Sequence, residues 1–143
     1  MIARRLRPEA LDELGLQSAL LALCSAVSER AGLRVVRDLE RDLPLNAEQE
    51  LVIYRVAQES ITNVVRHARA TTLHVTLRSD DAGGVLLVVR DDGVGLPPHA
   101  ENASNGLRGM RERALLVGAE ITIGPARPHG TEVTLRLPAE ELS

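Results

Sequence analysis

The sequence predicts an α+β fold, an α/β sandwich in which a mixed β-sheet is covered by helices on one face. Helical patterns occupy residues 9–31 and 50–69. Strand patterns come singly or in adjacent pairs, which favours hairpins beside a few helices. The segment Thr72–Arg78 alternates apolar with polar side chains, as expected in a sheet with one face left open.

Length and composition limit the classes of protein to which this chain can belong. The chain has 143 residues, 44% of them hydrophobic, and a net charge of −3, which suits a single domain with one core. The negative charge and the near absence of aromatic side chains argue against nucleic-acid binding. All 17 basic residues are Arg, so no Lys is available for catalysis.

Neither a membrane span nor a secreted protein is predicted. No apolar run is long enough to cross a bilayer, and no signal peptide pattern is present. The single Cys24 lies in an apolar helical stretch. We therefore expect a buried thiol in a reducing compartment.

The first predicted elements are a helix and a strand. Residues 9–31 carry an apolar stripe, and Gly32 is placed to end the helix. Gly15 is expected to break this helix and to separate a short first piece. Leu33–Leu39 alternates loosely and predicts a strand. The stripe consists of Leu16, Leu20, Leu23 and Val27.

The central predicted helix, Glu50–Arg69 with Asn46 as its N-cap, carries the most informative pattern. Glu59, Asn63 and His67 follow an i, i+4, i+8 ladder that continues an apolar stripe and belongs to neither main face. This favours the wall of a pocket, although an amphipathic helix with a polar boundary row fits equally well. The core face is Ile53, Ala57, Ile61, Val64 and Ala68, and the water face is Arg55, Gln58, Thr62, Arg66 and Arg69.

Strand patterns follow this helix. Thr72–Arg78 and the continuously apolar Val85–Val89 flank a turn cluster, so the pair predicts a hairpin. Residues 96–105 contain two prolines and no periodicity, which predicts a mobile loop. The remaining elements are a helix that Gly118 ends and two strands, at residues 106–117, 119–124 and 131–137.

Three glycine-containing segments are candidates for ligand binding. In residues 91–95, DDGVG, a carboxylate leaves a buried strand, and two glycines allow positive φ and close approach of a ligand. The pair of glycines in residues 106–110 opens a helix and can present N–H groups to phosphate. Gly130 and Thr131 begin the last strand. Each segment alone also fits an ordinary turn or helix start.

The order of these motifs resembles the Bergerat ATP-binding domain shared by sensor histidine kinases, gyrase B, MutL and the heat-shock chaperones. The closer resemblance is to the catalytic and ATP-binding domain of two-component sensor histidine kinases of the nitrate-sensor/DesK type. It covers residues 6–138 and is carried by LRPEALDELGL, QESITNVVRHA, DDGVG and GLRGMRERA.

This resemblance implies a Bergerat-type mixed sheet and the cofactors ATP and Mg²⁺. Asn63 would bind the Mg²⁺ that bridges the phosphates, and an amide oxygen is a suitable hard ligand. Glu59 would lie beside the γ-phosphate as a second catalytic residue. His67 would line the pocket near the adenine or the ribose.

The resemblance also implies roles beyond the helix. Asp91 would accept a hydrogen bond from the adenine amino group, and Gly93 and Gly95 would let the base approach. Thr131 would support Asp91 through a water. The segment expected to close on the phosphates is Gly106, Leu107, Arg108, Gly109 and Met110, with residues 97–105 as the ATP lid.

The resemblance further implies a catalytic fragment that needs partners. None of the four His residues has the setting of a phospho-accepting His, so the acceptor is expected upstream of Met1, on a separate dimerisation module. A response regulator would then receive the phosphoryl group. Residues 1–32 would be a helical linker from that region, and residues 33–143 the ATP-binding domain. The fragment would be cytoplasmic without membrane contact, even if the full-length protein is anchored.

Two other hypotheses compete. An anti-sigma-factor serine kinase has a similar E-x-x-x-N-x-x-x-H pattern, but LRPEALDELGL and GLRGMRERA favour the histidine kinase. A degenerate nucleotide-sensing or dimerising module would have no kinase activity. Intact Asn63, Asp91, Gly93 and Gly95 argue against it.

Overall fold

The computed structural model describes residues 8–95 and 105–142, apart from the side chains of residues 67, 68, 105 and 106. The predicted element order is confirmed. The helices are α1 (Glu9–Ala31), α2 (Ala47–Asn63) and α4 (Asn105–Leu116), with a short π-helix η1 (Val64–Ala68) and a 3₁₀ turn η2 (Ala139–Glu141). The strands are β1 (Arg34–Leu39), β2 (Thr72–Ser79), β3 (Val85–Asp91), β4 (Glu120–Pro125) and β5 (Thr131–Leu137).

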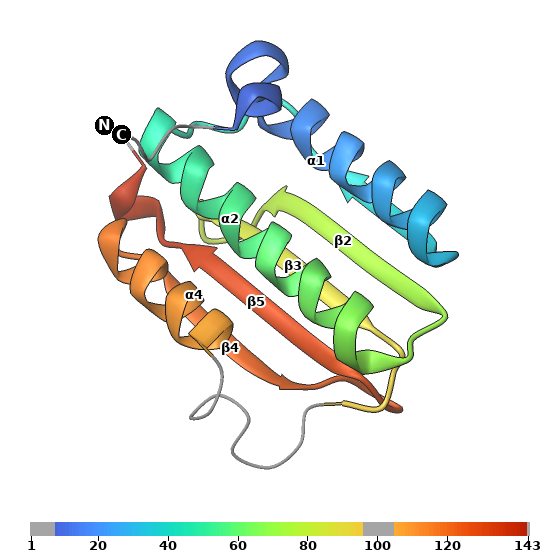
Figure 1. Ribbon diagram of the computed structural model, residues 1–143. Coiled ribbons are helices and arrows are strands. Elements are labelled where there is room, and N and C mark those ends of the chain that lie inside the picture. The colour runs from blue at the N-terminus through green and yellow to red at the C-terminus, as the bar shows by residue number, and fades with distance from the viewer. Residues whose placement is uncertain (1–7, 96–104, 143) are drawn as a thin grey trace.

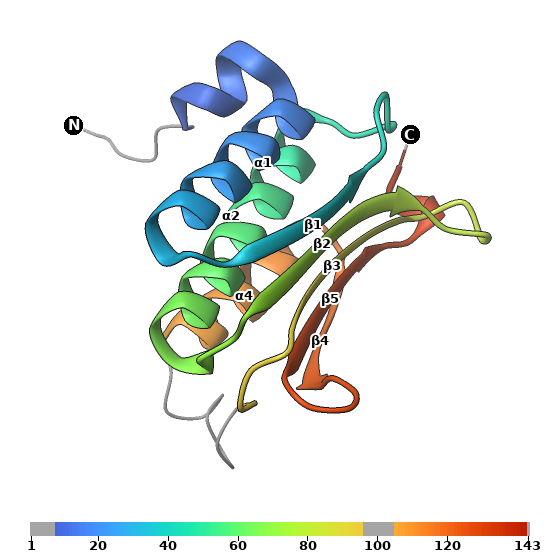
Figure 2. The same ribbon diagram turned by 90° about the vertical axis from the view of Figure 1, so that its right-hand side faces the viewer.

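The five strands form one mixed sheet in the order β1-β2-β3-β5-β4. Only β1 and β2 pair in parallel, and every other pairing is antiparallel. Helices α1, α2 and α4 lie side by side across the sheet (Figure 1). The view turned by 90° shows all three on the same face (Figure 2). The predicted fold class is therefore confirmed.

Strand alternation places the core under the helices. In β2, the side chains of Leu73, Val75 and Leu77 are buried, whereas their neighbours are half-buried or exposed. The apolar run in β3 also alternates, because Leu86 and Val88 point to the open face and are only half-buried. A strand places successive side chains on opposite faces, so the continuous run does not mean burial on both sides.

The predicted N-cap of α2 is confirmed as a capping box. Asn46 Oδ1 accepts from Gln49 N–H at 2.8 Å, and Gln49 Oε1 accepts from Asn46 N–H at 2.8 Å. The predicted core face is buried at Ile53, Ala57, Ile61 and Val64. The single helix expected up to Arg69 ends at Asn63 and continues as the π-helix η1, which Arg69 closes with a φ of 51°.

Helix α1 shows both predicted glycine effects. Gly15 is non-helical with a φ of 84°, and Gly32 ends the helix in the left-handed region with a φ of 68°. Leu11, Leu16, Ala19, Leu20 and Cys24 are buried in the same core as α2 and the sheet. The predicted burial of Cys24 is confirmed, and this burial raises the pKa of its thiol. The division into two units at residue 32 stays a prediction.

One expectation about α1 needs correction. By length and composition alone, this helix is long and apolar enough to cross a membrane. The reason is that no charged residue lies between Glu13 and Glu29. Here 28% of this apolar window is buried, in the core that α1 shares with the sheet.

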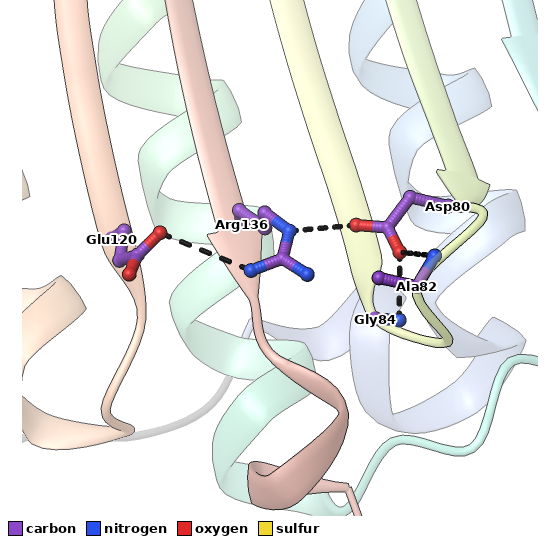
Figure 3. A network of polar contacts seen from close by, with 5 residues as sticks. All are labelled: Asp80, Ala82, Gly84, Glu120 and Arg136. Carbon is purple, nitrogen blue, oxygen red and sulfur yellow. Dashed lines mark hydrogen bonds and ion pairs between the residues drawn. The ribbon is translucent and has the colours of Figure 1, made fainter.

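A polar network fixes the turn between β2 and β3. Figure 3 shows Asp80 accepting from the N–H groups of Ala82 and Gly84 with one oxygen and from Arg136 Nε with the other, at 2.7 Å. Arg136 also lies 3.9 Å from Glu120 on β4. These contacts tie the hairpin to β5 and β4 at the end of β3 opposite Asp91.

Candidate functional site

A small, partly open cavity lies between the C-terminal part of α2, the start of α4 and the strands β3, β4 and β5. Its volume is about 30 Å³, which gives room for about two water molecules. Five of the sequence-predicted site residues line it: Asn63, Asp91, Gly95, Leu107 and Thr131. Segments far apart in the chain are thus brought together, as the motif order suggested.

The other predicted residues occupy different surroundings. Glu59 is half-buried one turn before Asn63 and is not part of the cavity lining, while Arg108 is exposed. The Met110 side chain is buried, with its sulfur 3.4 Å from Ser60 Oγ, so it packs against α2. Gly106 and Gly109 lie in the first turns of α4. His67 lies in η1, and its side chain is outside the described residues, as are residues 97–104 of the expected lid.

Asp91 is the buried carboxylate of the site, with 4% of its surface exposed. Its Oδ1 accepts from the Gly93 N–H at 2.7 Å. Burial raises the pKa of the Asp91 carboxyl, and hydrogen bonds from the Gly93 and Thr131 N–H groups partly oppose this shift. A desolvated carboxylate with few partners gains strongly from a ligand that donates a hydrogen bond.

The two glycines after Asp91 serve different purposes. Gly95 has a φ of 83°, which glycine adopts without strain. Gly93 is buried and is not among the residues with positive φ, so its use lies in close packing and in the N–H that it donates to Asp91.

Sequence reasoning missed part of the lining. Ser60, Val64, Val89, Ile123 and Val133 complete the cavity. Strand alternation was the available signal, because Val89 and Val133 lie two residues from Asp91 and Thr131 on the same face of their strands.

The neighbouring carboxylate, Asp92, has a different environment. Its two oxygens accept from the N–H groups of Thr71 and Thr72 and from the Thr71 hydroxyl, at 2.7–2.9 Å. These bonds lower the pKa of Asp92 to about 2, with the Thr71 hydroxyl as the main cause. Asp92 therefore joins the end of β3 to the start of β2.

We predict that Asp92→Asn lowers the free energy of unfolding at neutral pH by on the order of 1 kcal/mol, a value reduced for solvent screening. The folded-state pKa lies below the ordinary value of 3.8, so the contribution is present above about pH 4 and is lost as the pH falls through about 2. Urea unfolding of both proteins at neutral and acid pH tests this. A difference that stays constant down to about pH 2, or that Asp81→Asn reproduces, would contradict it.

Fold and cavity together define a class: an ATPase-type domain that places a buried Asp and a helix-borne Asn at one end of a mixed sheet. The sequence profile of the histidine kinase-, DNA gyrase B-, and HSP90-like ATPases matches residues 48–141. The chain belongs to that family, which confirms the resemblance drawn from the motifs.

Individual proteins agree with this assignment. The chain is 38% identical over 136 residues to the signal transduction histidine-protein kinase/phosphatase UhpB of Salmonella typhimurium. The match covers 94% of this chain and 27% of that protein. It is 38% identical over 142 residues to the sensor histidine kinase MctS of Rhizobium johnstonii, with 96% and 30% covered. The chain thus spans about 30% or less of the length of these curated relatives.

The fold has a solved counterpart. A blue-light activated histidine kinase of Erythrobacter litoralis EL346 superimposes with a TM-score of 0.76, over 90% of this chain and 46% of that chain. At 23% sequence identity, this similarity shows the fold alone.

Proposed function

We propose that this chain is the catalytic domain of a sensor histidine kinase, which binds Mg-ATP and donates the γ-phosphoryl group to a His on a dimerisation module, for relay to a response regulator. The single observation that carries this proposal is the cavity in which Asn63 and Asp91 meet, in a chain of this ATPase family. The sensor kinases among its relatives support the choice of reaction. In this proposal the domain works in the cytoplasm.

Asp91 is proposed to recognise adenine. Its carboxylate is buried and can accept from the exocyclic amino group, whereas guanine presents a carbonyl oxygen at that position. The cavity of about 30 Å³ is much smaller than a typical ligand pocket of about 300 Å³ or more. Binding therefore requires one wall to move, and Leu107 in the first turns of α4 is the proposed moving part.

The phosphates are proposed to lie between α2 and the start of α4. Asn63 lines the cavity, and its side-chain amide has one oxygen that can serve as a ligand. Among the described residues, no group of three His, Cys, Asp or Glu side chains could hold a metal ion. One protein oxygen fits Mg²⁺ well, because this ion keeps several waters and takes the rest of its ligands from phosphate. When bound, it would neutralise charge on the phosphates.

The remaining predicted residues have proposed roles around this centre. The N–H groups of Gly106 and Leu107 lie in the first turn at the positive end of α4 and would face the phosphates. Arg108, Gly109 and Met110 would belong to the same phosphate-binding segment. Glu59 would orient the acceptor imidazole, His67 would line the ribose side, and Gly93, Gly95 and Thr131 would form the floor beside Asp91.

We predict that Asn63→Ala abolishes the Mg²⁺ dependence of ATP binding and lowers the affinity in excess Mg²⁺ by about tenfold or more, because one metal ligand and one polar wall are lost. Calorimetric titration with a non-hydrolysable ATP analogue, with and without Mg²⁺, measures both effects. Thr62→Ala, on the predicted water face of the same helix, is the matched control. Equal Mg²⁺ linkage in Asn63→Ala and the unmodified chain would contradict the assignment.

Phosphoryl transfer tests the choice between kinases. In a chimaera, this chain would replace the matching 30% of the sensor histidine kinase MctS, and the acceptor His would have to come from the rest of that kinase. With labelled ATP, the histidine kinase predicts an acid-labile phosphohistidine on that part of the chimaera. Acid-stable label on a serine of an added anti-sigma-factor antagonist, without phosphohistidine, would instead favour the serine kinase.

A further inference from the structure

The turn between β4 and β5 packs directly on the Asp91–Gly95 segment. The Ala126 N–H donates to the Gly130 carbonyl at 3.0 Å and closes the turn. Gly130 has a φ of 113°, and a Cβ at this position would overlap the Asp91 carbonyl oxygen. A Cβ at Gly95 would lie 3.3 Å from the Gly130 carbonyl oxygen. The two turns are therefore in backbone contact.

His129 adds a side-chain contact between these turns. Its Nδ1 lies 3.2 Å from the carbonyl oxygen of Gly93. A carbonyl oxygen only accepts, so Nδ1 must carry the proton. Gly93 in turn donates its N–H to Asp91 Oδ1 at 2.7 Å. Gly93 is thus held on both of its polar groups, by His129 on one side and by the proposed adenine-binding carboxylate on the other.

We propose that His129 is a positioning residue, which holds Gly93 and thereby fixes the orientation of the Asp91 carboxylate toward adenine. This inference rests on the proposed ATP-binding function and adds a determinant of purine selectivity outside the motifs. Oδ1 accepts from Gly93, and the Thr131 N–H is a second donor to this carboxylate, so its orientation depends on the turns on both sides of the site. Without the His129 contact, the Gly93 carbonyl loses this side-chain partner and the Gly93 backbone can move. The Gly93 N–H then no longer holds the Asp91 carboxylate in one orientation.

Two features of His129 support a role in positioning rather than in folding. The ring is exposed, so its removal costs little packing. The protonated ring also opposes, as a minor contribution, the rise in the pKa of the Asp91 carboxyl that burial causes. Both effects act on the site without contributing to the core.

Two substitutions distinguish the effect of the His129 hydrogen bond from the effect of its imidazole ring. His129→Asn places an amide N–H where Nδ1 stands, because both nitrogens are bonded to Cγ. His129→Leu removes the donor. His74→Leu, on the open face of β2 opposite Arg90, is the control for loss of an imidazole ring away from the site. We expect about fivefold weaker binding of an ATP analogue by His129→Leu, a smaller ATP-to-GTP preference, and affinities within about twofold of the unmodified chain for His129→Asn and His74→Leu.

A second measurement uses the free protein, so it does not depend on nucleotide. Nitrogen NMR should show the Nδ1–H tautomer of His129, and hydrogen exchange at the Gly93 amide should accelerate in His129→Leu but not in His129→Asn. Unchanged ATP affinity in His129→Leu, an Nε2–H tautomer, or equal Gly93 protection in all variants would each overturn the inference. If the unmodified chain binds no ATP, the proposed function fails, and Gly93 protection still decides whether His129 holds this turn.

Discussion

Replacing Asp91 with Asn is expected to weaken ATP binding by about a hundredfold or more. Asp91 is 4% exposed, and one of its oxygens already accepts from the Gly93 N–H. An Asn that keeps this bond turns its NH₂ group toward the ligand, where it opposes the amino group of adenine, donor against donor. Calorimetric titration with a non-hydrolysable ATP analogue measures the loss.

The matched control is Asp92→Asn, one residue away. Asp92 bonds Thr71 and Thr72 rather than the cavity, so this variant should lose stability while its ATP affinity changes by less than about twofold. Burial raises the pKa of Asp91, so this carboxylate should become protonated at a higher pH than an ordinary Asp. As the pH is lowered, the ATP affinity of the unmodified chain should therefore begin to fall before ordinary Asp side chains titrate. Similar ATP affinities in Asp91→Asn and Asp92→Asn would contradict the role of Asp91.

Gly130→Ala is expected to cost about 3 kcal/mol or more of the free energy of unfolding, because a Cβ there would overlap the Asp91 carbonyl and because a φ of 113° strains any other residue. For a domain of this size, such a loss corresponds to a decrease in Tm of roughly 10 °C. Thermal and urea unfolding measure it, and nucleotide binding should be lost in parallel since the Asp91 turn is displaced.

Gly124→Ala is the control for this effect. Gly124 lies on β4 in the same hairpin, and a Cβ there meets nothing within 4 Å. Its stability should change by less than about 1 kcal/mol. If both variants lose a similar amount of unfolding free energy, the hairpin is destabilised by alanine at either glycine. The contact between Gly130 and Asp91 would then not be the cause.

Much of the fold is predictable from local pattern. The alternation of Leu73, Val75 and Leu77, the break at Gly15 and the cap at Asn46 each depend on neighbours within a few residues, and the structure confirms all three. The π-helix after Asn63 was not predicted, because the side-chain pattern of residues 64–68 still fits an α-helix. The apolar run in β3 also overstated burial, since composition does not say which face is covered.

Sequence analysis predicted only those site residues that lie within the recognised motifs. Asn63, Asp91, Gly95, Leu107 and Thr131 come together around one cavity, and their binding roles stay predictions. The contacts that His129 and Gly130 make were not predicted, because these contacts with residues 91–93 cross more than 30 residues of sequence. Such long-range backbone contacts depend on the pairing of β3 with β5, which periodicity does not encode.

Calorimetric titration of the unmodified chain with non-hydrolysable ATP and GTP analogues in Mg²⁺ tests the central claim most directly. The account predicts binding of the ATP analogue in the micromolar to sub-millimolar range and at least roughly tenfold weaker binding of the GTP analogue, since only adenine can donate to the buried Asp91 carboxylate. Equal affinity for both purines, or no binding of either, would contradict it.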